Sequence, residues 1–179
     1  MCGIVSVISN EGPIDPSLLV TMRDQLIHRG PDSAGLWVAG RFGFGQRRLA
    51  IVDPYPQSDQ PMVSPDRRFV LNYNGEIYNY IELRAELEAH GRSFVTKSDT
   101  EVLLQALIYW GESALPRLNG MFAFSLWDNN KREMLIARDR FGEKPLFYFS
   151  CPRYGFACAS ESVCRCSRAL LLTRTERRV

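Results

Sequence analysis

Four short stretches of the sequence carry residue types suited to nucleophilic catalysis and to binding charged groups. Cys2 directly follows Met1, so removal of Met1 would give one residue both a thiol and a free α-amine. Ionised thiols are strong nucleophiles, and an N-terminal amine can act as their base. Their reference pKa values, about 8.5 and roughly 7.7–8.0, allow proton transfer near neutral pH. We interpret Cys2 as a nucleophile with its own base; the alternative is a small buried residue that opens the first strand.

Asn74 and Gly75, followed by Glu76, stand between an expected strand and an expected helix. An Asn-Gly pair favours positive φ and a turn that exposes a backbone N–H. The Asn amide beside that N–H would supply two neutral donors, which can hold the oxyanion of a tetrahedral intermediate. The alternative is an ordinary turn.

Arg48 and Asp99 would bind the two charged ends of an amino acid. The planar guanidinium of Arg48 matches a carboxylate, and Asp99 stands in the expected first turn of a helix. The alternatives are a solvated surface arginine and an acid that the helix dipole favours.

His28 belongs to the stretch His-Arg-Gly-Pro-Asp, which is typical of a rigid, hydrogen-bonded loop. We therefore expect a structural role for His28 and not a role as base for Cys2. Four later cysteines lack the paired Cys-x-x-Cys spacing of zinc modules, so we expect no metal site at Cys151, Cys158, Cys164 and Cys166.

The composition predicts one packed domain with a short tail. The chain has 179 residues, of which 45% are hydrophobic and 11% aromatic. A net charge of +2 gives no indication of nucleic-acid binding. Neither a membrane-spanning run nor a signal peptide is recognisable. The odd number of five cysteines favours a reducing compartment, so we expect a cytoplasmic protein.

The pattern of apolar residues predicts an α+β fold with two stacked sheets between helical layers. A first helix is expected from Asp15-Pro16 to about residue 28, with Leu18, Met22 and Leu26 buried. A second is expected from Tyr80 to His90, with Asn79 as its cap. A third is expected from a Ser98–Glu101 capping box to Trp110. Residues 53–65 contain four prolines and are expected to form a loop. Strands are expected at residues 3–8, 36–39, 42–46, 69–73, 121–127, 133–137, 146–150 and 154–159, with a further short apolar stretch at 49–52.

Taken together, the motifs resemble the glutaminase domain of class II glutamine amidotransferases, in particular of glutamine-hydrolysing asparagine synthetases. The matching motifs run in order over about 160 residues, which makes the resemblance specific. They are Met-Cys-Gly-Ile at 1–4, His-Arg-Gly-Pro-Asp at 28–32, Arg-Arg-Leu-Ala-Ile-Val-Asp at 47–53, Asn-Tyr-Asn-Gly-Glu-Ile-Tyr-Asn at 72–79, Ser-Asp-Thr-Glu at 98–101, Leu-Asn-Gly-Met-Phe-Ala-Phe at 118–124, Arg-Asp-Arg-Phe-Gly at 138–142, Lys-Pro-Leu-Phe-Tyr at 144–148 and Ala-Ser-Glu at 159–161.

The resemblance implies a four-layer αββα sandwich of the N-terminal-nucleophile hydrolase type over residues 1–161. It implies hydrolysis of the L-glutamine side-chain amide to glutamate and ammonia, with Cys2 as nucleophile and with Asn74 and Gly75 as oxyanion donors. Arg48 would bind the α-carboxylate of glutamine, and Asp99 with Glu76 its α-amine. The backbone around Leu49, Ile51 and Val52 would line the same pocket.

The chain also departs from the family pattern. Family members continue into a synthetase domain that uses ATP and Mg and receives the ammonia. We interpret residues 162–179 as an atypical basic tail that a truncation or frameshift has put in its place. No cofactor is expected in residues 1–161, and a homodimer is left open. Glu143 stands where asparagine synthetases often carry an apolar residue, which leaves the ammonia acceptor open.

Two other functions are compatible with the sequence. The chain is a catalytically silent glutamine-binding or interaction module if Met1 is retained, because Met1 then acylates the Cys2 nitrogen and removes the base. Alternatively, it is an N-terminal-nucleophile amidase for another amide, although Arg48 and Asp99 favour an α-amino acid.

Overall fold

The chain forms two units, each built on one antiparallel sheet, in a computed structural model that describes residues 1–153 and 155–162. The first unit comprises Met1–Leu49 and the residues from Pro145 onward, and the second unit comprises Ala50–Lys144. Both ends of the described sequence therefore contribute strands to the same sheet.

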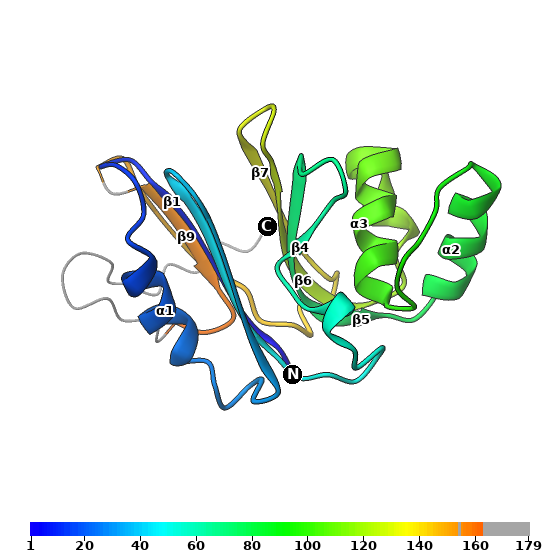
Figure 1. The fold of residues 1–179 in the computed structure, drawn as a ribbon, viewed down its shortest axis with the longest axis horizontal. Helices are drawn as coiled ribbons and strands as arrows, with labels where there is room; N and C mark the ends of the chain where they lie inside the picture. The colour runs from blue at the N-terminus through cyan, green and yellow to red at the C-terminus, as the bar shows by residue number, and fades with distance from the viewer. Residues whose placement is uncertain (154, 163–179) are drawn as a thin grey trace. The chain divides into compact units, whose positions relative to one another are not determined.

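The sheet of the first unit has five strands in the order β2-β3-β1-β9-β8. Helix α1 (Pro16–Asp24) lies against one face of this sheet (Figure 1). The core between them contains Val5, Leu19, Met22, Leu26 and Ala159. The strands are β1 (Gly3–Ser9), β2 (Ser33–Ala39), β3 (Phe42–Arg48), β8 (Phe147–Cys151) and β9 (Gly155–Ala159).

Helix α1 begins as predicted but ends earlier. The Asp15 side chain accepts a hydrogen bond from the Ser17 N–H, as an N-cap does. The helix stops at Asp24, because the N–H groups of Leu26 and Ile27 bond three residues back and tighten the chain into turns. Leu18 is only half-buried and packs at the margin of this core. Leu19, which the prediction omitted, is fully buried with Met22 and Leu26.

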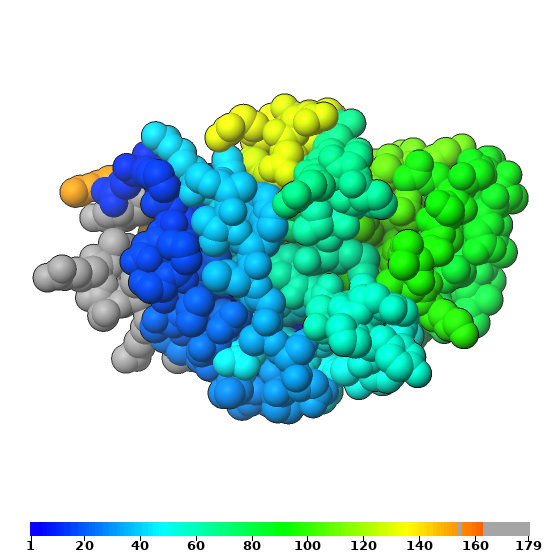
Figure 2. Space-filling model, viewed as in Figure 1, coloured from blue at the N-terminus to red at the C-terminus, as the bar shows by residue number. Residues whose placement is uncertain are grey.

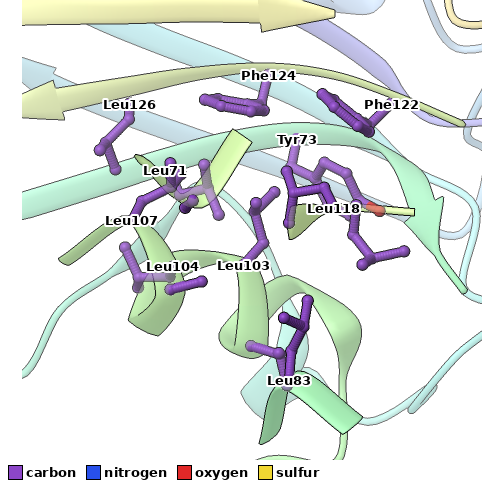
Figure 3. Packing of buried hydrophobic residues seen from close by; sticks show 14 of the residues in the cluster. Leu71, Tyr73, Leu83, Leu103, Leu104, Leu107, Leu118, Phe122, Phe124 and Leu126 are labelled. Atoms are coloured by element: carbon purple, nitrogen blue, oxygen red, sulfur yellow. The ribbon is translucent and has the colours of Figure 1, made fainter. Parts of the chain in front are cut away.

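The sheet of the second unit has four strands in the order β4-β5-β6-β7. Helix α3 (Asp99–Trp110) covers one face of it, and helix α2 (Tyr80–Ala89) packs on α3 (Figure 1). Leu103 of α3 lies beside Tyr73 of the sheet (Figure 3), and Leu104 and Leu107 belong to the same core cluster. The strands are β4 (Met62–Val63), β5 (Phe69–Ile77), β6 (Gly120–Asp128) and β7 (Glu133–Arg138), and two 3₁₀ helices lie at Pro56–Ser58 and Gly111–Arg117.

The surface of the second unit includes α2 and the turn between β6 and β7. The side chains of α2 appear in green and those of the turn in yellow in the space-filling view (Figure 2). The turn follows Asp128, whose carboxylate binds Arg68 through two oxygens at 3.0 and 2.7 Å. This bidentate pair joins the start of β5 to the end of β6.

Three local predictions in the second unit were wrong. Residues 53–65 are not loop throughout, since Met62 and Val63 pair with β5. The side chain of Asn79 does not cap α2; it binds Arg117 O and Asn119 N. The capping box is half formed: Ser98 Oγ accepts from the Glu101 N–H, but Glu101 binds the N–H groups of Val95 and Thr96 instead of returning to Ser98.

The other helix ends and hairpins agree with the predictions. Gly91 and Gly111 follow their helices with positive φ, and the four predicted hairpin strands of β2–β3 and β6–β7 pair as expected. Apart from Ser162, the basic tail predicted at 162–179 lies outside the described residues, as do Cys164 and Cys166. Among the helices that the structure describes, none is long and apolar enough to span a membrane.

Candidate active-site residues

Cys2 lies half-buried at the start of β1, with its sulfur against the backbone of Leu49. The Leu49 N–H donates to Cys2 Sγ at 3.4 Å, and Sγ lies 3.7 Å from the Leu49 carbonyl oxygen. The carbonyl can accept the proton of a thiol, whereas the N–H stabilises a thiolate. The backbone of Leu49 can therefore hold the sulfur in either protonation state.

The pairing of β1 with β3 explains why Cys2 and Arg48 lie together. Gly3 is opposite Arg47 in this antiparallel register, so its continuation places Cys2 opposite Arg48. Arg48 is buried, with 7% of its surface exposed. A buried arginine at the end of a strand differs from the solvated surface arginine that was the alternative. The structure thus brings together Cys2, Arg48 and Leu49, three of the predicted site residues.

The His-Arg-Gly-Pro-Asp stretch supports the end of β3. A side chain at Gly30 would meet the backbone of Arg47 at 2.4 Å, so only glycine allows the two segments to approach this closely. The Asp32 N–H donates to Arg48 O at 3.0 Å. His28 Nε2 lies 2.8 Å from Glu161 Oε1, which agrees with the structural role expected for this histidine.

Asn74 and Gly75 do not form the predicted turn. Both lie inside β5, which continues to Ile77, and they pair with Ala123 and Phe122 of β6. Gly75 is not among the glycines with positive φ. A Cβ at Gly75 would meet Met121 O at 2.4 Å, so close packing against β6, and not turn geometry, requires glycine here.

The strand geometry nevertheless exposes an N–H of the expected kind. The N–H groups of Tyr73 and Ile77 point away from β6, where they donate to Gln60 Oε1 and Asp99 Oδ2. N–H groups two residues apart point to the same side of a strand, so the Gly75 N–H points to this edge as well. Strand β4 pairs with β5 only as far as Leu71, so it does not cover this part of the edge.

The side chain of Asn74 provides a second donor. It is almost completely buried, at 1% exposure, and Nδ2 has no hydrogen-bond partner in the described part of the chain. A buried amide without a partner costs free energy, and its presence often indicates a functional role. Asn74 and Gly75 therefore supply two adjacent donors, as an oxyanion-binding pair requires.

Asp99 is buried in the first turn of α3, where β5 holds its carboxylate. The Tyr73 hydroxyl donates to Asp99 Oδ2 at 2.7 Å, and the Ile77 N–H donates to the same oxygen at 3.0 Å. Burial raises the pKa of Asp99, and these two hydrogen bonds oppose the increase. Glu76 is half-buried on β5, and its charge also raises the pKa of Asp99. Two neighbouring carboxylates, those of Asp99 and Glu76, can together bind an ammonium group.

The remaining predicted residues lie in the segment that follows β3. Ile51 and Val52 are at the start of the second unit and belong to no strand, and Ile51 is 70% exposed. Asp53 in the same segment accepts a hydrogen bond at 2.7 Å from the N–H of Lys97, which stands two residues before Asp99 in the sequence.

Tyr73 and Gln60 also contact the candidate site, and neither was predicted from the sequence. Tyr73 reads as an ordinary apolar residue of an alternating strand, and its hydroxyl contact with Asp99 joins residues 26 positions apart. Gln60 stands in a proline-rich segment, and nothing in the sequence indicates that it binds the Tyr73 N–H at 2.7 Å. No group of three or more His, Cys, Asp or Glu side chains suited to a metal occurs within residues 1–153 and 155–162.

Known proteins match this chain in sequence and in fold. A family model described as a glutamine amidotransferase domain matches residues 1–175. Asparagine synthetase [glutamine-hydrolyzing] 1 of Bacillus subtilis is 46% identical over 153 residues, covering 83% of this chain and 24% of the relative. A putative asparagine synthetase [glutamine-hydrolyzing] of Mycobacterium bovis is 43% identical over 182 residues, covering 92% of this chain and 28% of the relative. The chain thus spans about a quarter of the length of these curated relatives.

A solved structure confirms the predicted fold class. Glutamine phosphoribosylpyrophosphate amidotransferase from B. subtilis, complexed with ADP and GMP, matches with a TM-score of 0.77 at 24% identity, covering 91% of this chain and 42% of that chain. The fold is therefore α+β, of the N-terminal-nucleophile hydrolase type. Since the family model covers nearly the whole sequence, the chain belongs to the glutamine amidotransferase domain family.

Proposed function

We propose that this chain hydrolyses the side-chain amide of L-glutamine, with Cys2 as nucleophile, and supplies ammonia to a synthetase of the asparagine synthetase kind. The observation that carries the proposal is the sulfur of Cys2 held at 3.4 Å by the Leu49 N–H, next to the buried Arg48. Family membership and the similarity to glutamine-hydrolysing relatives support glutamine as the substrate.

Removal of Met1 starts the proposed mechanism, because it frees the α-amine of Cys2. This amine takes the thiol proton while the sulfur attacks the amide carbon of glutamine. The Asn74 amide and the Gly75 N–H stabilise the resulting oxyanion. The C–N bond then breaks, the leaving nitrogen takes the proton and departs as ammonia, and a γ-glutamyl thioester remains. Water attacks the thioester, which releases glutamate and restores the thiol.

Substrate binding in this proposal uses both charged ends of glutamine. Arg48 binds the α-carboxylate through its guanidinium fork, and Asp99 with Glu76 binds the α-ammonium. The backbone near Leu49, Ile51 and Val52 lines the side-chain amide. This mode of binding requires all of these residues to contact one substrate molecule.

A synthetase domain or chain that receives the ammonia is the proposed partner. The matched residues make up only 24% and 28% of the two curated relatives, which supports such a partner. ATP and Mg would belong to that partner and not to residues 1–161. The proposal places the reaction in the cytoplasm, leaves a homodimer open, and leaves the ammonia acceptor open because Glu143 departs from the asparagine synthetase pattern.

The second candidate is a glutamine-binding module without activity. It requires that Met1 is retained in the mature protein, because an acylated Cys2 nitrogen cannot act as a base. Glutamine binding measured by calorimetry, without glutamate formation, would establish this candidate.

The decisive experiment measures glutamate released from glutamine by the full chain after its N-terminal mass has been determined. We expect turnover from the chain that begins at Cys2, and none from Cys2→Ala, which should still bind glutamine. Cys151→Ala is the matched control and should keep the full rate, since this half-buried cysteine has no assigned role. Unchanged turnover by Cys2→Ala would exclude the mechanism. Equal turnover of other amides would point to a different amidase.

A further inference from the structure

The Tyr73 side chain spans the distance between two of the proposed functional residues. Its ring passes over Gly75, where an added Cβ would lie 2.8 Å from Tyr73 Cε2, and its hydroxyl reaches Asp99 Oδ2 at 2.7 Å. The side chain is 2% exposed and belongs to the core of the second unit. A buried phenol needs a hydrogen-bond partner, and here the partner is the carboxylate proposed to bind substrate.

The hydrogen bonds from β5 fix the orientation of this carboxylate. The Tyr73 hydroxyl and the Ile77 N–H both donate to Oδ2, and Oδ1 receives neither bond. Two donors on one oxygen hold the plane of the carboxylate, because rotation about its χ2 angle would break both. The Thr100 N–H also donates to the Asp99 carboxylate, but each carboxylate oxygen can accept more than one hydrogen bond, so Oδ1 can still bind a ligand.

We infer that Tyr73 is a positioning residue for glutamine binding: its hydroxyl holds Asp99 Oδ2 so that Oδ1 meets the substrate ammonium. This inference rests on the proposed function. It predicts an effect on substrate affinity and not on the chemical step, because the hydroxyl acts only through Asp99.

The charge of Asp99 gives the inference a second consequence. Asp99 binds an ammonium only when ionised, whereas burial and the neighbouring Glu76 favour its neutral form. The hydrogen bond from Tyr73 favours the ionised form. Loss of the hydroxyl therefore raises the pKa of Asp99 further. As the pH is lowered, Tyr73→Phe should lose glutamine binding at a higher pH than the parent chain does.

The test compares Tyr73→Phe with the parent chain, in two forms. In the active form we expect KM to rise about tenfold, or about 1.4 kcal/mol, with kcat within twofold. In a Cys2→Ala background, calorimetry should show the same loss of affinity, with the acid limb of the binding profile moved to higher pH. Tyr80→Phe is the matched control, since Tyr80 also packs on this core, and it should change neither quantity.

A double-mutant cycle separates this role from simple packing. In a Cys2→Ala, Asp99→Asn background, Tyr73→Phe should weaken binding less than twofold, because the residue through which it acts has changed. The inference is overturned if affinity and its pH profile are unchanged in Tyr73→Phe, or if kcat falls while KM stays constant. Binding without hydrolysis by the parent chain would refute the proposed function and leave the inference standing. Normal hydrolysis by the parent chain, together with unchanged glutamine affinity in Tyr73→Phe, would refute the role of Tyr73 and leave the proposed function standing.

Discussion

The Leu49 N–H donates a hydrogen bond to the sulfur of Cys2 across 47 residues of sequence. The bond exists because β1 and β3 are neighbours in the first sheet, so their ends hold Cys2, Arg48 and Leu49 together. The candidate nucleophile and the candidate carboxylate-binding residue are thus set by one strand pairing.

A chain with a blocked Cys2 nitrogen should lose its activity. We expect a cleavable extension in front of Cys2 to lower the rate of glutamine hydrolysis by a factor on the order of 10²–10⁴, the usual contribution of a general base. Glutamate release measured before and after cleavage checks this, with the N-terminus confirmed by mass spectrometry. Equal rates for the two forms would show that the α-amine is not the base.

Asn74→Ala should slow glutamine hydrolysis without destabilising the fold. The loss of an oxyanion donor should lower kcat by about 10²–10³, with little change in KM. The free energy of unfolding should not fall, because Asn74 Nδ2 has no hydrogen-bond partner in the described residues. Steady-state kinetics and urea unfolding check the two quantities. Asn72→Ala, on the same face of β5, is the control and should keep kcat within about threefold of the parent; an equal kcat loss in both variants would indicate a packing effect.

Arg48→Lys should weaken substrate binding. An ammonium cannot reproduce the two parallel hydrogen bonds of a guanidinium to a carboxylate, so we expect KM to rise about tenfold or more. Arg47→Lys is the matched control. Arg47 binds Asp24 at 2.6 Å, so this change should lower stability and leave KM unchanged. Similar KM values for Arg48→Lys and the parent chain would remove Arg48 from the substrate site.

The Arg68–Asp128 pair should contribute to stability in a pH-dependent way. Hydrogen bonds from Arg68 are the main reason that the pKa of Asp128 falls to about 2. Since the pKa is lowered in the folded state, the stabilisation is present above the unfolded value of 3.8 and is lost as the pH falls toward 2.

Asp128→Asn should therefore reduce the free energy of unfolding at pH 7 by about 1–2 kcal/mol, and the difference should shrink toward zero near pH 2. Urea unfolding at a series of pH values measures it. Glu112→Gln, an exposed acid, serves as control and should show no such trend. A constant difference at every pH would contradict an origin in the charge of Asp128.

The sequence predicted the elements better than the contacts between them. Hairpins, helix-stop glycines and the helix at residues 99–110 follow from local propensity and periodicity, and the structure confirms them. Residue chemistry and the family resemblance predict the same roles for Cys2 and Arg48, and the pairing of β1 with β3 explains why these residues lie together.

Local rules failed where longer-range contacts decide the conformation. Asn-Gly at 74–75 has the composition of a turn, but pairing with β6 keeps it in a strand. Glu101 has the spacing of a capping box, but the N–H groups of Val95 and Thr96 compete for its carboxylate. Tyr73 and Gln60 carry no local signal, because their partners lie far away in sequence.

Labelling with a glutamine-like chloroketone tests the central claim most directly. Peptide mass mapping should find one equivalent of label on Cys2, and excess glutamine should prevent it. Cys158 should remain unlabelled, because burial raises its pKa to about 12. Label on Cys151 in place of Cys2, or label on Cys2 that glutamine does not prevent, would contradict the account.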